Sequence, residues 1–346
     1  MPETQKALLI EKKFGDFVVG DTEKYKPGPG EILVKVHAVA LNPRDWKMRK
    51  FGFFMDEFPA VLGIDIAGSV EELGAGVTEH KLGDRVFFQG DLEKRKSGFQ
   101  QYAISLAVTA AKIPPNLSYD EAATIPLSIS SAYVGLYNPK PHGAGFSPPS
   151  GPAGEGKYAG VPLVVLGGAS SVGQLTIQVA RLSGFWPIVT TASLKHNEYL
   201  KSLGATHVLD RHLSSDALKA DVDKATNGKP VEIVYDAVSL EETQKLGLEL
   251  VAPGGQLVID FTPAVESQDG KTVIFFLAGL RMPNNLELLE NLYHEKITGF
   301  LERGAIKPTR FEVLPNGLAG IVDGLQRLET DQISGLKLVA HPQETL

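Results

Sequence analysis

Val164-Val165-Leu166-Gly167-Gly168-Ala169-Ser170-Ser171-Val172-Gly173 is the stretch that decides the fold. An apolar run over residues 161–166 leads into it, and a helical pattern continues to residue 183. A glycine turn between a strand and a helix is the context that a dinucleotide-binding turn requires. Gly167 and Gly168 allow a tight turn close to a pyrophosphate, and Gly173 allows the helix to pack on the strand. The start of that helix, from Ala169 through Ser170, Ser171 and Val172, would present N–H groups to the phosphates.

Strand and helix patterns alternate after this turn. Apolar, β-like runs occupy residues 187–191, 207–209, 231–236, 256–260 and 272–277. Helical patterns separate most of them, at residues 197–203, 214–225 and 240–250. This alternation predicts an α/β fold with a doubly wound parallel sheet. One further helix at 318–329 and a strand at 335–340 close the chain, and we expect that strand to return to the first domain.

The first third of the chain has a different pattern. Short β-like runs at residues 32–39, 64–70 and 85–88 are separated by glycine and proline turns, which predicts a compact β-barrel or sandwich. We therefore expect a β-rich substrate domain over residues 1–125 and 295–346, and a cofactor domain over residues 126–294. Between the two patterns, eleven of the 23 residues at 138–160 are Gly or Pro. This segment is expected to be a surface loop, or alternatively a functional loop near the active-site cleft.

Composition excludes several classes of protein. The 346 residues have 43% hydrophobic and 22% charged side chains and a net charge of −7. These are globular values, and the acidic balance argues against nucleic acid or an anionic membrane as a partner. The absence of cysteine excludes disulfides, thiol nucleophiles and thiolate zinc sites. The uncharged stretch 158–180 contains Gly, Ser and Pro, as expected of a folded core rather than a membrane span, so we expect a cytoplasmic protein.

The end of the second expected strand indicates the choice of cofactor. NAD-specific sites place an acidic residue about 20 residues beyond the turn, where it binds the ribose 2′-hydroxyl. Here Ser193 stands at that distance from Gly173, and Lys195 is close by. Arg211, after the third strand, could add a second cation. A hydroxyl and cations suit a 2′-phosphate, which predicts NADPH; the alternative is that both cations are ordinary surface charges.

Several motifs together resemble a known family. Asn42-Pro43-Arg44-Asp45-Trp46-Lys47, Leu82-Gly83-Asp84-Arg85-Val86, the turn at 63–68 and Leu203-Gly204-Ala205 occur in family order around the cofactor turn. They resemble the zinc-independent quinone-oxidoreductase and trans-enoyl-reductase branch of the medium-chain dehydrogenase/reductase superfamily. The loop at 138–160 and the ending at 335–339 resemble its fungal enoyl-reductase-like members. The resemblance implies a GroES-like barrel domain, a Rossmann domain and an active site between them.

The resemblance also implies roles for individual residues. Lys47 would lie near the nicotinamide ribose and the substrate, with Asp45 orienting it. Ser131 would face the nicotinamide, and Lys337 would belong to the cofactor-binding residues. Asn42 would be catalytic, or else structural at a turn before Pro43. The alternatives are a surface role for Lys47 and a hydroxyl bonded to the helix backbone for Ser131.

Zinc-dependent relatives hold their metal through a Cys and a His, where this chain has Asn42 and Ile64, so we expect no metal. Phe51, Phe53 and Phe54 follow Lys47, and we expect them to shape an apolar pocket or the core.

Without a metal to stabilise an alkoxide, hydride addition to a conjugated double bond is the easier reaction, because the charge spreads into an enolate. We therefore expect an NADPH-dependent reductase of α,β-unsaturated carbonyl compounds, acting on a small-molecule substrate. The alternatives are a quinone or aldehyde reductase, a trans-acting enoyl reductase that serves a polyketide synthase, and an NADPH-binding protein without catalysis. The apolar run at 272–277 is an expected sheet edge, which favours a homodimer unless a helix covers it.

Overall fold

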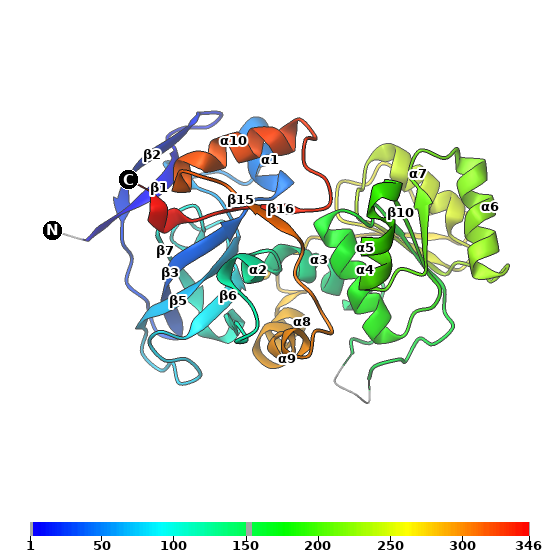
Figure 1. The fold of residues 1–346 in the computed structure, drawn as a ribbon, viewed down its shortest axis with the longest axis horizontal. Helices are drawn as coiled ribbons and strands as arrows, with labels where there is room; N and C mark the ends of the chain where they lie inside the picture. The colour runs from blue at the N-terminus through cyan, green and yellow to red at the C-terminus, as the bar shows by residue number, and fades with distance from the viewer. Residues whose placement is uncertain (1–2, 150–153, 346) are drawn as a thin grey trace. The chain divides into compact units, whose positions relative to one another are not determined.

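A computed structural model describes residues 3–149 and 154–345 (Figure 1). The chain divides into two compact units. Unit 1 comprises Met1–Leu127, Glu290–Glu302 and Pro308–Leu346, and unit 2 comprises Ser128–Leu289 and Arg303–Lys307. We had expected boundaries at 125/126 and at 294/295. Within the described residues, no helix is both long and apolar enough to cross a membrane.

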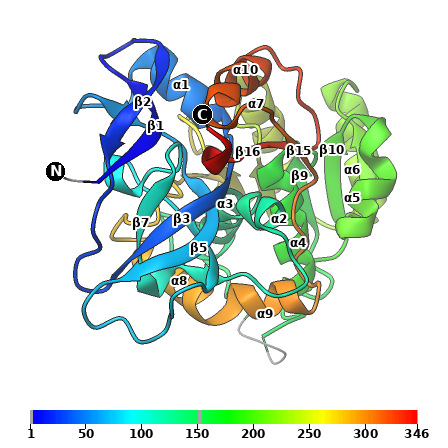
Figure 2. The same ribbon diagram turned by 60° about the vertical axis from the view of Figure 1, so that its left-hand side comes forward.

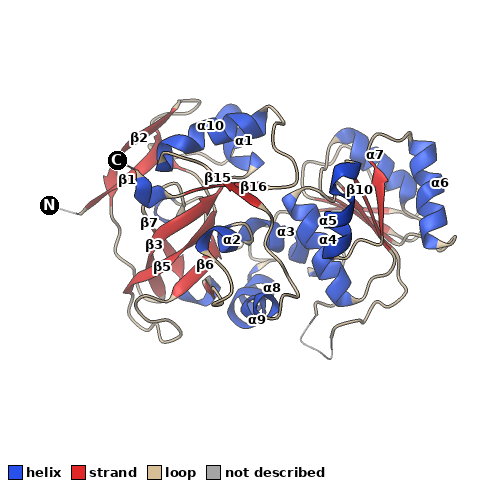
Figure 3. Cartoon of the chain, in the orientation of Figure 1, coloured by secondary structure: helices blue, strands red, loops and turns tan. Residues whose placement is uncertain are grey.

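Unit 2 is built on a six-stranded sheet in the order β11-β10-β9-β12-β13-β14. Figure 3 shows strands of this sheet in red among the blue helices of the unit. All neighbouring strands are parallel, so the predicted doubly wound parallel sheet is confirmed. The order reverses beside β9, between β10 and β12, where open α/β sheets bind their ligands. The strands are β9 (Leu163–Leu166), β10 (Ile188–Ala192), β11 (His207–Asp210), β12 (Ile233–Asp236), β13 (Gln256–Ile259) and β14 (Thr272–Phe275).

The helices of unit 2 follow from this strand order. Right-handed crossovers on the two sides of the reversal place the helices after β9 and β10 on one face, and those after β11 and β12 on the other. Val164, Val234 and Leu257 belong to the buried apolar cluster of this unit. The helices are α3 (Pro126–Tyr137), which begins in unit 1, α4 (Ser171–Ser183), α5 (Asn197–Leu203), α6 (Ser215–Thr226) and α7 (Glu241–Leu250).

The Gly- and Pro-rich loop lies against unit 2. Its described parts, 138–149 and 154–160, contain no helix and no strand longer than an isolated bridge from Ala159 to Phe185. The Tyr158 ring stacks on Phe185 at 4.8 Å, and Phe146 meets both rings edge-on. The hydroxyl of Tyr158 accepts the N–H of Ser147 at 2.5 Å. Aromatic packing therefore holds the described parts of the loop against unit 2. A functional role for the loop stays a prediction, and some of the residues concerned lie outside the described ones.

Unit 1 contains two sheets, as the β-like runs predicted. One is seven-stranded, ordered β15-β16-β3-β5-β6-β8 with β7 on β3; the other is ordered β2-β1-β4. Strand β16 lies antiparallel to β3, so the end of the chain returns to the first domain as expected (Figure 2). The strands are β1 (Thr4–Ile10), β2 (Phe17–Glu23), β3 (Glu31–Ala40), β4 (Ala60–Val61), β5 (Asp65–Leu73), β6 (Arg85–Gln89), β7 (Tyr102–Leu106), β8 (Ala111–Lys112), β15 (Phe311–Val313) and β16 (Lys337–Ala340).

Helix α1 (Pro43–Phe51) was not predicted from the sequence. Pro43 stands at its first position, where the missing N–H costs nothing. Gly52 ends it in the left-handed conformation, with φ 69°. The other helices of unit 1 are α2 (Tyr119–Ala123), α9 (Ile297–Glu302) and α10 (Gly317–Glu329), and α8 (Leu286–Asn291) straddles the boundary with unit 2.

A buried ionic network holds the centre of unit 1. The Lys337 ammonium donates to Asn42 Oδ1 at 2.8 Å and forms an ion pair with the Asp65 carboxylate. Asn42 Nδ2 donates to the same Asp65 oxygen at 3.0 Å. The other Asp65 oxygen accepts the N–H of Leu127 at 2.6 Å, in the first turn of α3. Strands β5 and β16 and helices α1 and α3 therefore share one charged centre, with all three of its side chains buried.

The network predicts a large loss of stability when one charge is removed. Lys337→Met should destabilise the protein by about 3–5 kcal/mol, because the Asp65 carboxylate stays buried without its counter-ion. Urea unfolding followed by circular dichroism measures the change. Arg327→Met, which breaks the partly exposed pair with Glu312, is the control and should cost no more than about 1 kcal/mol. Equal effects of the two substitutions would contradict this account.

Candidate functional site

The glycine turn after β9 is shaped by close contacts. Gly167 adopts φ 77°, in the left-handed region that favours glycine. A Cβ at Gly168 would lie 2.0 Å from Thr190 Oγ1, and one at Gly173 would lie 2.4 Å from the Gly167 oxygen. Both positions therefore need glycine for packing, as the sequence predicted for Gly173.

The turn leaves a defined set of amides free. The Gly167 N–H donates to the side-chain Oγ1 of Thr191 at 3.0 Å, and the Gly168 N–H donates to the backbone carbonyl oxygen of Thr191 at 2.9 Å. Gly173 N donates to Ser170 Oγ at 3.0 Å. Among the described residues, no protein acceptor meets the N–H groups of Ala169, Ser171 and Val172. These three amides, at the N-terminus of α4, are therefore free to donate to an anion, as predicted for the phosphates.

The predicted 2′-phosphate residues lie along the same sheet edge. Ala192 and Asp210 end the neighbouring strands β10 and β11 in register. The next residues, Ser193 and Arg211, therefore begin adjacent loops, and Arg211 N donates to the Ala192 oxygen at 3.1 Å. Lys195 is exposed, and no carboxylate among the described residues lies within 4.0 Å of it. The fold thus brings Ser193, Lys195 and Arg211 to the edge that carries the glycine turn.

Gln174 and Tyr199, which were not predicted from the sequence, connect helices α4 and α5 to this edge. Gln174 Nε2 donates to the Ala169 oxygen at 2.9 Å, and its Oε1 accepts the Tyr199 hydroxyl at 2.8 Å. Tyr199 lies in the first turn of α5, directly after the segment that holds Ser193 and Lys195. The buried Gln174 side chain therefore links the glycine turn to the helix that follows Ser193 and Lys195. Its position one turn into α4 was the only sequence signal.

Asp236, at the end of β12, was also missed. It stands beside Leu166 in the parallel register, so it flanks the turn on the side opposite β10. Its carboxylate accepts the N–H groups of Val238 and Ser239 at 3.0 and 2.9 Å, and burial raises its pKa. The bonds hold Val238 against the turn, where a Cβ on Gly167 would lie 2.3 Å from Val238 Cγ2. An acidic residue ending a strand was the available signal.

The residues predicted to be catalytic in the first domain lie on or before α1. Asp45 Oδ2 accepts the backbone N–H of Asn42 at 2.9 Å and so caps the helix. Burial raises the pKa of this carboxyl to about 6. Lys47 is half-buried, with Nζ 5.7 Å from the centre of the Trp46 ring. Asp45 therefore fixes the start of the helix that carries Lys47. The Asn42 side chain belongs to the buried network with Asp65 and Lys337, which agrees with the structural role that was the alternative for Asn42.

The two remaining predicted residues, Ser131 and Lys337, belong to other elements of the chain. Ser131 is buried in the part of α3 that belongs to unit 2, where its carbonyl accepts the Tyr235 hydroxyl at 2.9 Å. The Lys337 ammonium is engaged by Asp65 and Asn42, both in unit 1. Its assignment to the cofactor stays a prediction.

The three phenylalanines after Lys47 are not part of the core. Phe51, Phe53 and Phe54 are 49, 48 and 63% exposed, so the expectation of a core position was wrong. Neighbouring rings in this series are 5.6 and 6.5 Å apart. They form an exposed aromatic surface at the end of α1.

Comparison with known proteins identifies the family. Residues 28–116 match the alcohol dehydrogenase GroES-like domain, and residues 171–268 match the zinc-binding dehydrogenase domain. The trans-enoyl reductase himH of Aspergillus japonicus is 33% identical over 89% of both chains. The 2-methylene-furan-3-one reductase of Solanum lycopersicum is 34% identical over 90% of this chain and 72% of its own. The chain belongs to the medium-chain dehydrogenase/reductase superfamily, in its enoyl-reductase-like branch.

Solved structures of superfamily members share the fold. A putative zinc-dependent alcohol dehydrogenase from Rhizobium etli CFN 42 superposes with a TM-score of 0.82 at 24% identity, covering 99% of both chains. The CurK enoyl reductase superposes with a TM-score of 0.75 at 21% identity, over 98% of this chain and 99% of its own. Its membership of the family, shown by the relatives above, makes the protein an oxidoreductase and implies a nicotinamide cofactor.

The residues of this chain fit a dinucleotide cofactor but not a zinc ion. The free amides of the turn and the close glycines suit a dinucleotide pyrophosphate. Zinc does not fit, because the chain has no cysteine and no cluster of three or more metal-binding side chains occurs within residues 3–149 and 154–345. Asn42 and Ile64 occupy the motif positions where zinc relatives have ligands. We therefore derive no chemistry from a metal.

The turn geometry makes a specific prediction for cofactor binding. Gly168→Ala should weaken binding of the reduced dinucleotide at least about tenfold, since the added Cβ displaces the turn from Thr190. A fluorescence titration of the nicotinamide measures the dissociation constant. Gly299→Ala is the control, because a Cβ there meets nothing within 4 Å. Unchanged affinity of Gly168→Ala would show that the turn does not hold the cofactor.

Proposed function

We propose that the protein is a zinc-independent, NADPH-dependent reductase of the carbon–carbon double bond of α,β-unsaturated carbonyl compounds. The observation that carries the proposal is its similarity to two reductases of unsaturated carbonyl compounds, a trans-enoyl reductase and a 2-methylene-furan-3-one reductase, over about nine-tenths of the chain. The side chains support it, because the described residues contain no cluster of zinc ligands that could stabilise an alkoxide.

In this mechanism the protein supplies orientation and electrostatics. The bound nicotinamide provides the hydride. Lys47 donates a hydrogen bond to the developing enolate oxygen or to the nicotinamide ribose, and Asp45 holds the helix that presents it. Ser131 contributes a hydroxyl near the nicotinamide. A proton then reaches the α carbon from a side chain or from water.

NADPH is proposed over NADH on the charges at the edge of the sheet. Ser193 replaces the acidic residue of NAD-specific sites, and Lys195 and Arg211 lie on the loops that begin there. Arg211 makes only a 3.3 Å contact to the ring of His212. Both cations are therefore available to a 2′-phosphate, since neither has a carboxylate partner in the described part of the chain.

Assembly and location complete the proposal. The outer side of β14 has no partner strand among the described residues. Phe275, which ends this strand, and Leu277, just after it, are 37 and 41% exposed. Such an edge favours pairing with a second copy, so we propose a homodimer. The absence of cysteine is compatible with a cytoplasmic location, which we also propose.

The cofactor preference can be measured directly. The wild type should bind NADPH more than about tenfold more tightly than NADH, because each charge-assisted contact contributes roughly 1.5–3 kcal/mol. Lys195→Ala should weaken NADPH binding and leave NADH binding nearly unchanged. Lys201→Ala, an exposed position on α5, is the matched control and should preserve the ratio. Equal wild-type affinities for the two cofactors would refute the preference.

The reaction itself is decided by product analysis with an enal. We expect the saturated aldehyde, whereas an allylic alcohol would show reduction of the carbonyl and overturn the proposal. Lys47→Ala should lower kcat by roughly tenfold to a thousandfold, the loss expected for one donor to the developing charge. Lys50→Ala, on the same helix and paired with Glu329 at 2.7 Å, should keep wild-type kinetics. A fully active Lys47→Ala would leave the reaction class standing and remove Lys47 from it.

A further inference from the structure

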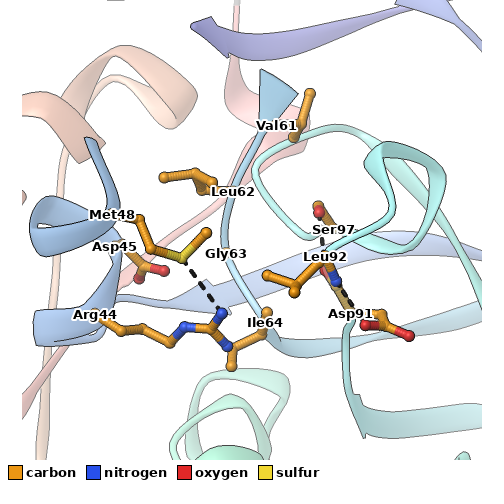
Figure 4. Close-up of a pocket in the computed structure, with 10 residues that line it drawn as sticks. All are labelled: Arg44, Asp45, Met48, Val61, Leu62, Gly63, Ile64, Asp91, Leu92 and Ser97. Atoms are coloured by element: carbon orange, nitrogen blue, oxygen red, sulfur yellow. Dashed lines mark hydrogen bonds between the residues drawn. The ribbon is translucent and has the colours of Figure 1, made fainter. Parts of the chain in front are cut away.

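A shallow pocket in unit 1 has one guanidinium among mostly apolar walls (Figure 4). Arg44, in the first turn of α1, extends into it toward Ile64. The apolar walls are Met48, Val61, Leu62, Ile64 and Leu92. Ligand pockets combine apolar walls with a few polar groups that fix orientation, and a guanidinium can pair with a planar carboxylate through two parallel hydrogen bonds.

The guanidinium of Arg44 has no oxygen acceptor in the described part of the chain. Its one hydrogen bond runs from Nη2 to Met48 Sδ at 3.3 Å, and a thioether is a weak acceptor. Every other arginine of unit 1 donates to oxygen. These donors and their acceptors are Arg49 to Gly15 and Asp16, Arg85 to Leu117, Arg95 to Glu31 and Glu93, Arg310 to Gly335, and Arg327 to Glu312.

The two carboxyl groups on the pocket wall are occupied elsewhere. Asp45 accepts the Asn42 N–H in the cap of α1, and Asp91 accepts the N–H of Leu92 at 2.7 Å. Neither lies within 4.0 Å of the Arg44 guanidinium. The remaining donors of this half-buried, permanently charged group therefore have no protein acceptor among the described residues and can bind an anion that enters the pocket.

We propose that Arg44 is an anion subsite that binds a carboxylate carried by the unsaturated substrate. This deepens the proposed function and rests on it. Arg44 and Lys47 stand three residues apart on α1, so their side chains leave neighbouring positions on one face of the helix. The subsite selects acidic substrates, with the apolar part of the molecule against Leu62 and Ile64.

A matched pair of substrates tests the subsite. An α,β-unsaturated ketone with a carboxylate and its methyl ester differ only in the anionic group. The wild type should show the higher kcat/KM for the acid. Arg44→Met should lower kcat/KM for the acid by about tenfold to a hundredfold, mainly through KM, and change the ester less than about threefold. Arg44→Lys should give a kcat/KM for the acid between those of the wild type and Arg44→Met, since lysine keeps the positive charge but lacks the paired donors of the guanidinium.

Arg49→Met is the control on the same helix, because that guanidinium is already bound by Asp16 and Gly15. It should preserve the acid-to-ester ratio of the wild type. A wild type that does not distinguish acid from ester, or an Arg44→Met variant that keeps the ratio, would overturn the subsite.

A binding measurement separates this inference from the proposed function. Cinnamate, titrated calorimetrically into the full-length protein with saturating oxidised cofactor, should bind the wild type at least tenfold more tightly than it binds Arg44→Met. If the wild type reduces neither ketone, the proposed function fails, and the cinnamate titration still decides the subsite. Equal affinity of the wild type and both Arg44 variants for cinnamate, or no binding to any of them, would reject it.

Discussion

The ion pair between Lys337 and Asp65 is the interaction on which unit 1 depends. It joins β16 to β5, and through Asn42 and Leu127 it reaches the starts of α1 and α3. A buried pair of this kind stabilises little by itself, but either charge alone would be costly, so the four elements are held in one arrangement. Helix α1 carries Lys47 and Arg44, and its orientation is therefore set by a strand almost 300 residues later.

The cofactor edge of unit 2 depends on hydrogen bonds between neighbouring strand ends. Thr191 accepts two N–H groups of the glycine turn, and the amides that follow are the ones that we propose for the phosphates. Gln174 and Tyr199 brace the same turn from the helices, and Asp236 holds the next loop against it. A parallel sheet produces this convergence, because all its carboxyl ends lie at one edge and the strand order reverses there.

Chemistry in unit 1 is concentrated on one short helix. Asn42 and Asp45 are used to build its first turn, with the Asp45 pKa raised by burial. Arg44 and Lys47, on the same helix, are the cations that we propose for the substrate, beside the exposed rings that begin at Phe51. A permanently charged guanidinium and an ammonium suit an acidic, conjugated substrate better than a neutral alcohol.

The parallel sheet, the glycine turn and the return of the last strand could be predicted from the sequence, because strand period, helix period and turn chemistry are local properties. The same pattern predicts that Ser193 and Lys195 follow a strand end at the sheet edge that carries the turn, since the carboxyl ends of parallel strands share one side. The buried ion pair between Lys337 and a partner 272 residues away could be found only in the folded chain. The folded chain also shows that Phe51 is exposed, and that Arg44 alone among the arginines of unit 1 lacks an oxygen acceptor within the described residues. Pairings between distant charges depend on sheet order and burial, which no local pattern records.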